Sequence, residues 1–546
     1  MKNIVLTSIL LLALVGCGQG QLEGSAFKDN GYQEDTVYIS GNVFGLPADK
    51  TLKVAYDKFV EDEQVNLNIT PDSEGNFDIR IPVINSTRLY LYYFMQGNTI
   101  TLFAEPGERI KIHSDWEKKT LNFSGEHARA HQDVYDYHCY LNSLSLPYSY
   151  VDCMDKTISH REYLNRITAE WCKSDSLLND YRQMHPQMSE RSVVQIQSMN
   201  QNRYAFQLMQ RKFSLKMPPG SEAFPEWYMQ KADSIYNRLT RPYTLMDATF
   251  LRDYLDYYYE HQGGVAKNLK MLFNYLEEHK GIILTEEQQM DGKYLNTPAM
   301  KEALAEAYEA MSQNVDYEAA LIDRWCGGIE LVPMPSDLKE LMYASYHYFY
   351  LNGSQKAMFE ENMNRFHSLV KNPAIARPLV ELQAKFVELA KRDMGETLSL
   401  MGYEHLKDCK TGEDLFLEII KPYKGKVIYL DVWGTWCSPC KRQMSYVASI
   451  KEAMKGKDVV FLYLANQSPE SSWENIIKEY GLLGEQSVHY NLPGAFQNML
   501  EKHLGVKAYP TYLLIDRDGK IVDREPPRPD TESGLVDYLN KCLEVK

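Results

Sequence analysis

The sequence predicts a multidomain protein with an N-terminal all-β, sandwich-like domain, a central all-α domain and a C-terminal α/β domain. A chain of 546 residues is too long for one hydrophobic core and is expected to divide. Its apolar pattern is strand-like at first, then becomes helical, and ends with short buried strands separated by helices. We therefore predict these three domains at residues 28–125, 126–400 and 401–546.

The overall charge argues against nucleic acid as a partner. The formal net charge is -15 at pH 7, and the lysines and arginines form no long basic run. An acidic surface repels the phosphate backbone that a nucleic-acid-binding protein has to attract. Hydrophobic residues make up 44% of the chain and charged residues 24%, which is ordinary for globular domains and excludes wholesale disorder.

The first residues have the pattern of an export signal. Lys2 supplies the positive start, residues 4–15 are mostly apolar, and the small residue Gly16 ends the run. A membrane-spanning helix needs about 20 apolar residues, so this run is too short to be one.

The end of this signal carries a second pattern. Residues 14–17, Leu-Val-Gly-Cys, resemble the lipobox of bacterial lipoproteins. The resemblance implies a signal peptide at residues 1–16, a lipid on the thiol of Cys17, and a linker over residues 17–27. The alternative is a secreted protein in which Cys17 is incidental.

The two regions ahead of the C-terminal domain differ in periodicity. Residues 36–41 and 89–94 are β-branched and aromatic, and glycine-containing turns separate such runs, which favours β structure. Across residues 338–349 the apolar side chains recur at helical spacing. Pro335 and Pro373 stand where first helical turns are expected to start.

The C-terminal pattern alternates between buried strands and helices. Short, wholly apolar runs are typical of strands that are covered on both faces. An Asp-Gly pair between the last two runs predicts a hairpin. The predicted elements are strands at 427–433, 459–465, 510–516 and 520–522, and helices at 441–453 and 532–543.

Two cysteines separated by two residues follow the first of these strands. At the start of a helix, unpaired backbone N–H groups and the helix dipole stabilise a thiolate, which is the form that attacks a disulfide. Cys437 is therefore the predicted nucleophile, and Cys440, one turn further on, is placed to attack the resulting mixed disulfide. Half of a zinc site is the alternative, but no second Cys-x-x-Cys or close His pair follows in this domain.

The surroundings of this motif resemble those in a known family. Residues 430–441, Leu-Asp-Val-Trp-Gly-Thr-Trp-Cys-Ser-Pro-Cys-Lys, are similar to the active-site strand and turn of thioredoxins. Residues 508–511, Ala-Tyr-Pro-Thr, resemble the cis-proline loop that faces that turn. The resemblance implies a thioredoxin fold for residues 401–546 and thiol:disulfide exchange as its activity.

The same resemblance implies roles for five further residues. Asp431 matches a carboxylate that lies buried behind the second cysteine and exchanges protons with it, because desolvation raises its pKa. The alternative for Asp431 is a strand-edge aspartate exposed to water. Trp436 would form an apolar rim. Tyr509, Pro510 and Thr511 would form the substrate-binding loop, in which a cis Pro510 exposes the backbone of Tyr509 to an extended substrate.

The closest subgroup is that of the membrane-anchored TlpA-like reductases, which include those that serve cytochrome c maturation. Residues 510–521 and the extra segment 467–504 resemble this subgroup, and the N-terminal region resembles the β domain of Bacteroidetes-type lipoproteins. This implies an enzyme of the cell envelope, anchored by lipid and facing the periplasm or placed in the outer membrane. The implied partners are protein disulfides, the lipid membrane and a membrane dithiol electron donor. The redox-active disulfide Cys437–Cys440 would be the working centre, with no other cofactor.

Two other functions stay open. The same two thiols run in the oxidising direction if their reduction potential is high, which gives a disulfide oxidase or isomerase. Pro439 before Cys440 favours the reducing kind. The second alternative is a binding lipoprotein in which the helical domain carries the function, and the intact redox motif argues against it.

Histidines and cysteines elsewhere predict no further centre. His127 and His131 stand at i and i+4, but no third well-spaced ligand accompanies them, so we expect solvated side chains and no metal. The six other cysteines are Cys139, Cys153, Cys172, Cys326, Cys409 and Cys542. Export permits disulfides among them, but no spacing selects one of the 15 pairings that six cysteines allow.

Overall fold

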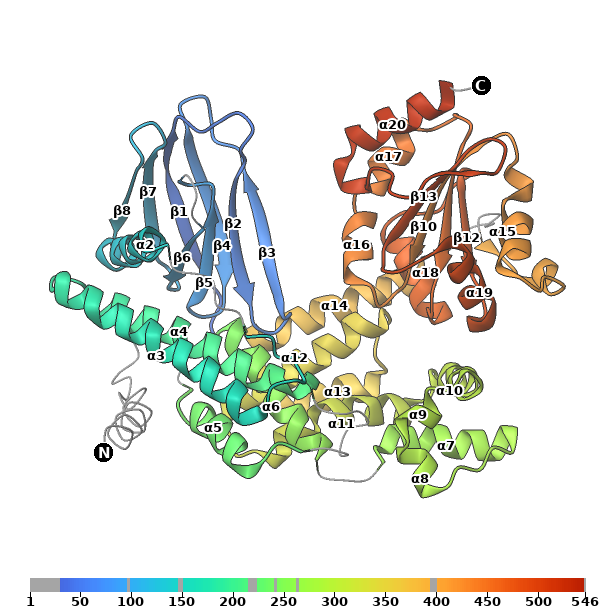
Figure 1. The fold of residues 1–546 in the computed structure, drawn as a ribbon, viewed down its shortest axis with the longest axis horizontal. Helices are drawn as coiled ribbons and strands as arrows, with labels where there is room; N and C mark the ends of the chain where they lie inside the picture. Colours follow the sequence, from blue (N-terminus) through green and yellow to red (C-terminus); the bar gives the residue numbers. More distant parts are fainter. Residues whose placement is uncertain are drawn as a thin grey trace.

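The computed structural model describes residues 30–95, 99–145, 151–214, 223–239, 243–261, 265–392 and 400–544. Figure 1 shows a helical domain that extends along one side of the molecule, with a β domain and a C-terminal α/β domain both resting on it. The predicted signal peptide, the linker and Cys17 lie outside the described residues. Within the described ranges, none of the helices is long and apolar enough to cross a membrane.

The β domain consists of two four-stranded sheets that share one core. The strand orders are β4-β1-β7-β8 and β3-β2-β5-β6. The strands are β1 (Asp35–Phe44), β2 (Leu52–Lys58), β3 (Glu63–Ile69), β4 (Asn76–Val83), β5 (Thr87–Tyr92), β6 (Ile100–Ala104), β7 (Arg109–Asp115) and β8 (Thr120–Gly125). Ile39 from one sheet and Leu89 from the other are fully buried in the same apolar cluster. Strand β7 alternates between buried and exposed residues, with one face toward this core and the other toward water, whereas β6 is buried on both faces.

The helical domain follows directly. Its helices are α2 (Ala128–Ser143), α3 (His160–Met184), α4 (Glu190–Gln210), α5 (Glu226–Tyr236), α6 (Leu245–Glu260), α7 (Lys267–Lys280), α8 (Glu286–Met290), α9 (Gly292–Leu295), α10 (Pro298–Met311), α11 (Val315–Leu331), α12 (Ser336–Ser354), α13 (Glu360–Leu369) and α14 (Pro373–Lys391). Pro335 is the residue before α12 and Pro373 is the first residue of α14. Proline suits these positions because a first helical turn leaves the backbone N–H groups unbonded anyway.

The C-terminal domain has a six-stranded sheet of order β14-β13-β10-β11-β12-β9. Its elements are β9 (Leu400–Met401), α15 (Gly412–Ile420), β10 (Val427–Trp433), α16 (Ser438–Met444), α17 (Val447–Ala453), β11 (Val459–Ala465), α18 (Glu470–Glu479), β12 (Ser487–Asn491), α19 (Gly494–Leu504), β13 (Thr511–Ile515), β14 (Ile521–Asp523) and α20 (Ser533–Glu544). Side chains of α16, α17, α18 and α20 pack in the apolar cluster on one face of the sheet, and those of α15 and α19 pack on the other.

One prediction about this domain is wrong. In place of a single helix over residues 441–453, the chain forms α16 and α17 with a break between them. The hydroxyl of Ser445, the residue after α16, donates to the carbonyl of Arg442 at 2.7 Å, and a local bond of this kind competes with the helical ladder. The first helix also begins earlier than predicted, because Pro439 is suited to a first turn.

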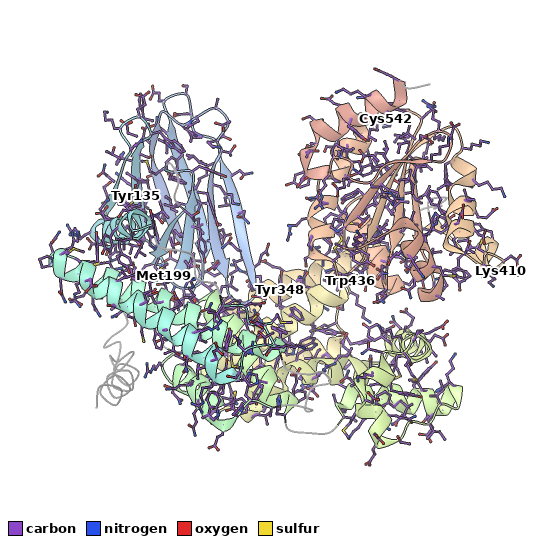
Figure 2. The ribbon with its side chains drawn as sticks, viewed as in Figure 1. Tyr135, Met199, Tyr348, Lys410, Trp436 and Cys542 are labelled. Carbon is purple, nitrogen blue, oxygen red and sulfur yellow. A yellow bond between two sulfur atoms is a disulfide. The ribbon has the colours of Figure 1, made fainter. Side chains whose placement is uncertain are left out.

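The C-terminal domain rests on the helical domain through α18. The side-chain amide of Asn475 donates to the backbone carbonyl of Gln355 at 2.8 Å, in a buried position at the end of α12. At the rim, Lys385 of α14 forms an ion pair with Glu479 at 2.6 Å. Figure 2 shows Trp436 on the side of the C-terminal domain that faces the helical domain. The predicted redox motif therefore lies near the junction of these two domains.

Candidate active site

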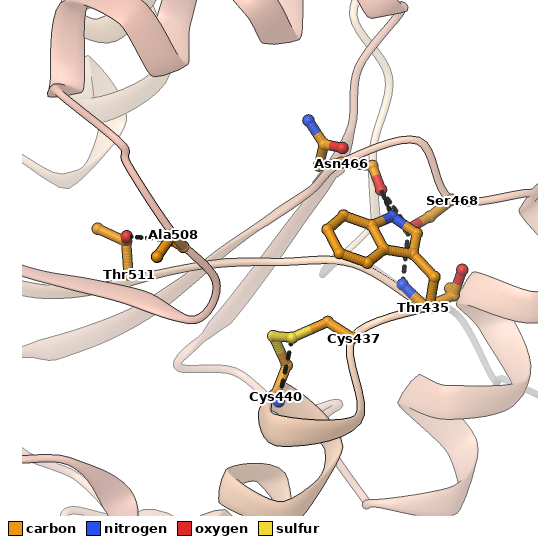
Figure 3. Close-up of a disulfide and its surroundings, with 8 residues drawn as sticks. Thr435, Cys437, Cys440, Asn466, Ser468, Ala508 and Thr511 are labelled. Carbon is orange, nitrogen blue, oxygen red and sulfur yellow. Dashed lines mark hydrogen bonds between the residues drawn. A yellow bond between two sulfur atoms is a disulfide. The ribbon is translucent and has the colours of Figure 1, made fainter. Parts of the chain in front are cut away.

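Cys437 and Cys440 form a disulfide at the start of α16. Cys437 is the residue that caps the helix, and its Sγ accepts a hydrogen bond from the backbone N–H of Cys440 at 3.2 Å. Figure 3 shows this bond beside the disulfide. Both cysteines are buried, with 3% and 0% of their surface exposed. The same N–H group can stabilise a thiolate on Cys437 when the pair is reduced, and the second sulfur is shielded from other reactants.

Asp431 lies in the middle of β10, on the face of the sheet that α16 covers. The strand alternates, so Asp431 shares its face with Tyr429 and Trp433, which pack in the same cluster as the two cysteines. Only 2% of Asp431 is exposed. Its strand-edge alternative, a carboxylate in water, does not describe this position.

The environment of Asp431 disfavours its charged form. Burial raises its pKa to about 8, and the neighbouring Tyr512 opposes this only in part. Tyr463 of β11 and Tyr512 of β13 pair with Asp431 across the sheet. Among the described residues, none donates a hydrogen bond to its Oδ1 atom. A carboxyl group with such a pKa can take up a proton near neutral pH and release it again.

The loop predicted to bind substrate lies beside Trp436. The Tyr509–Pro510 peptide bond is cis, and the hydroxyl of Thr511 donates to the carbonyl of Ala508 at 2.6 Å. The rings of Tyr509 and Trp436 meet edge to face, with centroids 5.0 Å apart. Trp436 is 49% exposed, so its outer face is open to a partner.

The rim residue Trp436 is also held from the opposite side. Its indole Nε1 donates to the backbone carbonyl of Asn466 at 3.1 Å, and the backbone N–H of Thr435 donates to Ser468 at 3.0 Å. Figure 3 shows both bonds above the disulfide. The apolar surface around the sulfurs is therefore fixed by two loops from distant parts of the chain.

Sequence reasoning did not identify several residues of this site. Asn466 and Ser468 follow β11 and hold the active-site turn, and Tyr463 and Tyr512 flank Asp431. The sequence signal for Asn466 and Ser468 is that they are polar residues directly after a buried strand. The signal for Tyr463 and Tyr512 is that they are tyrosines within a buried strand. Neither signal names a partner, because the partner lies on another strand.

Of the two histidines expected to be solvated, His131 is buried and His127 keeps 20% of its side chain exposed. His131 is 1% exposed, and its Nε2 lies 2.8 Å from a carboxylate oxygen of Glu108. His127 lies 3.2 Å from the same oxygen. These side chains join α2 to the loop before β7. Among the described residues, no group of three or more His, Cys, Asp or Glu side chains is arranged to hold a metal ion.

Four of the remaining cysteines carry unpaired thiols: Cys153, Cys326, Cys409 and Cys542. Burial raises the pKa of Cys326, Cys409 and Cys542, so these thiols stay protonated and unreactive at neutral pH.

Comparison with known proteins defines the class of the C-terminal domain. Residues 425–521 match a protein-family model described as thioredoxin-like. The match includes both cysteines, Asp431 and Pro510. Residues 425–521 therefore belong to a thioredoxin-like domain, and this part of the chain is similar to thiol-disulfide oxidoreductases.

The chain is similar to particular thiol-disulfide oxidoreductases over its C-terminal part. A thiol-disulfide oxidoreductase ResA from Bacillus thuringiensis is 34% identical over 124 residues, which are 22% of this chain and 66% of that protein. The ResA of Bacillus subtilis is 31% identical over 120 residues, 21% of this chain and 62% of that protein. The chain thus spans just under two thirds of the length of these relatives. A thioredoxin domain of a Bacteroides vulgatus thiol-disulfide oxidoreductase is 22% identical, covers 23% of this chain and 84% of that one, and has a TM-score of 0.20.

Proposed function

We propose that the protein is a membrane-anchored thiol:disulfide oxidoreductase that reduces disulfides of exported proteins. The observation that carries this proposal is the Cys437–Cys440 pair at the start of α16, on the sheet face that also bears the buried Asp431. A nucleophile, a resolving thiol and a proton acceptor are the three groups that the exchange needs.

The reaction begins with the reduced pair. The thiolate of Cys437 attacks one sulfur of the substrate disulfide, forms a mixed disulfide, and releases the other substrate sulfur as a thiolate that takes a proton from water. Cys440 then gives its proton to Asp431 and attacks the sulfur of Cys437. The mixed disulfide breaks, and the second substrate sulfur leaves and is protonated. Two electrons have passed to the substrate, and the protein holds the Cys437–Cys440 disulfide, which a membrane dithiol donor must reduce again.

A trapping experiment tests the activity and identifies the substrate. Cys440→Ser leaves Cys437 able to attack but removes the thiol that resolves the mixed disulfide. We expect the variant to accumulate covalent complexes with exported proteins, and oxidised apocytochrome c is one candidate. Dithiothreitol should reduce the mixed disulfide and release the trapped protein. Cys437→Ser is the matched control and should trap nothing. A Cys440→Ser chain that forms no mixed disulfide would contradict the proposed function.

The anchor is a separate part of the proposal and rests on the lipobox-like residues at 14–17. We expect Cys17→Ala to prevent lipidation and to release the chain from membranes, because the lipid on the Cys17 thiol is the proposed anchor. Fractionation with metabolic labelling by a radioactive fatty acid measures both effects. A Cys17→Ala chain that stays membrane-bound and unprocessed would show that the apolar segment itself is the anchor.

A further inference from the structure

Four side chains beside the disulfide form a closed ring of contacts. Glu501 accepts a hydrogen bond from the hydroxyl of Tyr509 at 2.7 Å. Tyr509 packs edge to face on Trp436, and Trp436 donates to the backbone of Asn466 at 3.1 Å. The side-chain amide of Asn466 donates a hydrogen bond to Oε1 of Glu501 at 2.9 Å, which closes the ring.

Glu501 is the charged member of this ring, and both of its oxygens are used. Oε2 accepts from Tyr509, and Oε1 accepts from Asn466 and from Gln497 of the same helix at 2.8 Å. Hydrogen bonds to a carboxylate are about twice as strong as those between neutral groups. Burial and the bond to Glu501 raise the pKa of Tyr509, so its hydroxyl stays protonated and remains a donor.

The ring joins segments that are far apart in the chain. Glu501 lies on α19, within the extra segment 467–504, whereas Trp436 precedes α16 and Tyr509 lies in the loop before β13. The indole of Trp436 also packs closely on Gly434, where an added Cβ would lie 2.6 Å from its Nε1 atom. The indole of Trp436 is therefore held both by its contact with Gly434 and by its contacts with Tyr509 and Asn466.

We propose that Glu501 is a positioning residue that sets the spacing between the Trp436 rim and the Tyr509–Pro510 loop, and thereby selects extended protein disulfides over small ones. This inference rests on the proposed function. An extended polypeptide needs both surfaces at once, since it lies on the rim and pairs with the loop. A small disulfide needs access to the sulfur of Cys437 alone.

The experiment compares two disulfides with the full-length chain. Insulin serves as the protein disulfide and oxidised glutathione as the small one, with dithiothreitol as the reductant. For Glu501→Ala we expect KM for insulin to rise about tenfold with little change in kcat, because binding is lost and the chemistry is not. The rate with glutathione and the reduction potential should stay at wild-type values, since none of the hydrogen bonds of Glu501 among the described residues reaches a cysteine.

Two further variants sharpen the test. Glu501→Gln keeps the shape and most of the hydrogen bonds, and should restore a near-wild-type KM. Lys502→Ala, on the exposed side of the same helix, is the matched control and should behave like wild type. If Glu501→Ala does not fold, Tyr509→Phe removes only the hydroxyl that Glu501 holds, and should itself raise KM for insulin.

The outcomes separate this proposal from the proposed function. A wild-type KM for insulin in Glu501→Ala or Tyr509→Phe, or equal losses with insulin and glutathione, would overturn the role of Glu501. A wild-type chain that reduces neither disulfide would contradict the proposed function and not the positioning role alone.

Discussion

Glu318 in the helical domain and Asp431 in the C-terminal domain are equally buried carboxyl groups, each with 2% of its surface exposed, but their surroundings differ. Glu318 accepts hydrogen bonds from the backbone N–H of Phe359 at 2.9 Å, the amide of Asn362 at 2.8 Å and the hydroxyl of Tyr350 at 3.2 Å. Asp431 has an Oδ1 atom to which no described residue donates, and its pKa is raised to about 8. Burial with full hydrogen bonding makes a structural residue, whereas burial without it leaves a group that can exchange protons.

The two domains also hold two buried cysteines of different character. Cys326 lies 3.9 Å from Nδ1 of His347, a pairing that in other settings activates a thiol. Here both groups are fully buried, and burial raises the pKa of Cys326 and lowers that of His347 to about 4. Proximity of Cys and His does not produce a thiolate in an apolar interior. Cys437 instead stands at the start of a helix next to an exposed rim.

Asp431→Asn is the change with the largest expected effect. We expect the second step, attack of Cys440 on the mixed disulfide, to slow by about 10²-fold or more, while the first step stays near the wild-type rate. Rapid mixing with acid quench, followed by separation of the mixed disulfide, measures the two steps separately. Equal slowing of both steps would remove Asp431 from the mechanism.

The pH profile of the same step checks the cause. The base is the deprotonated form of Asp431, so the wild-type resolving rate should rise with pH through the pKa of about 8. The Asp431→Asn variant should lack that inflection. A wild-type rate that is flat across this range would show that the carboxyl group does not limit the step.

Glu318→Ala tests the other half of the comparison. We expect the free energy of unfolding of the helical domain to fall by about 3 kcal/mol, because three donors lose their buried acceptor. Urea denaturation followed by far-UV circular dichroism measures this, with the exposed Glu302→Ala as the control. Insulin reduction at a temperature where the variant is folded should be unchanged. A Glu318→Ala variant that is as stable as wild type but reduces insulin more slowly would contradict a purely structural role for Glu318.

The last prediction concerns the reduction potential of the Cys437–Cys440 couple, for which we expect the smallest departure from an ordinary value. This potential decides whether the protein reduces or oxidises its substrates. Helix capping favours the thiolate of Cys437, but its immediate neighbours in sequence, residues 436, 438 and 439, include no cation that would stabilise it further. We expect Cys437 to titrate nearer ~7 than ~4, and the couple to lie nearer about -270 mV than about -120 mV. Equilibration with glutathione buffers measures the reduction potential, and the pH dependence of the alkylation rate measures the titration of Cys437. A potential above about -180 mV would favour an oxidase or isomerase.

The sequence alone predicted the order of the domains and the place of the Cys-x-x-Cys motif between a buried strand and a helix. Strands β10 and β11 occupy the predicted residues 427–433 and 459–465, because wholly apolar runs of this length bury both faces in a sheet. The two cysteines were found because their spacing and the strand before them are local signals. The break between α16 and α17 was missed, since residues 444–447 contain no proline or glycine that would mark it in the sequence.

Only the tertiary structure decided which distant groups meet. The sequence placed His127 and His131 in water, but α2 packs them against Glu108. It marked residues 467–504 only as an extra segment that resembles one subgroup, whereas folding brings Glu501 of that segment to the two loops beside the disulfide. Periodicity and spacing report on neighbours along one strand or helix. Contacts between elements depend on how whole faces pack, which one sequence does not encode in any local pattern.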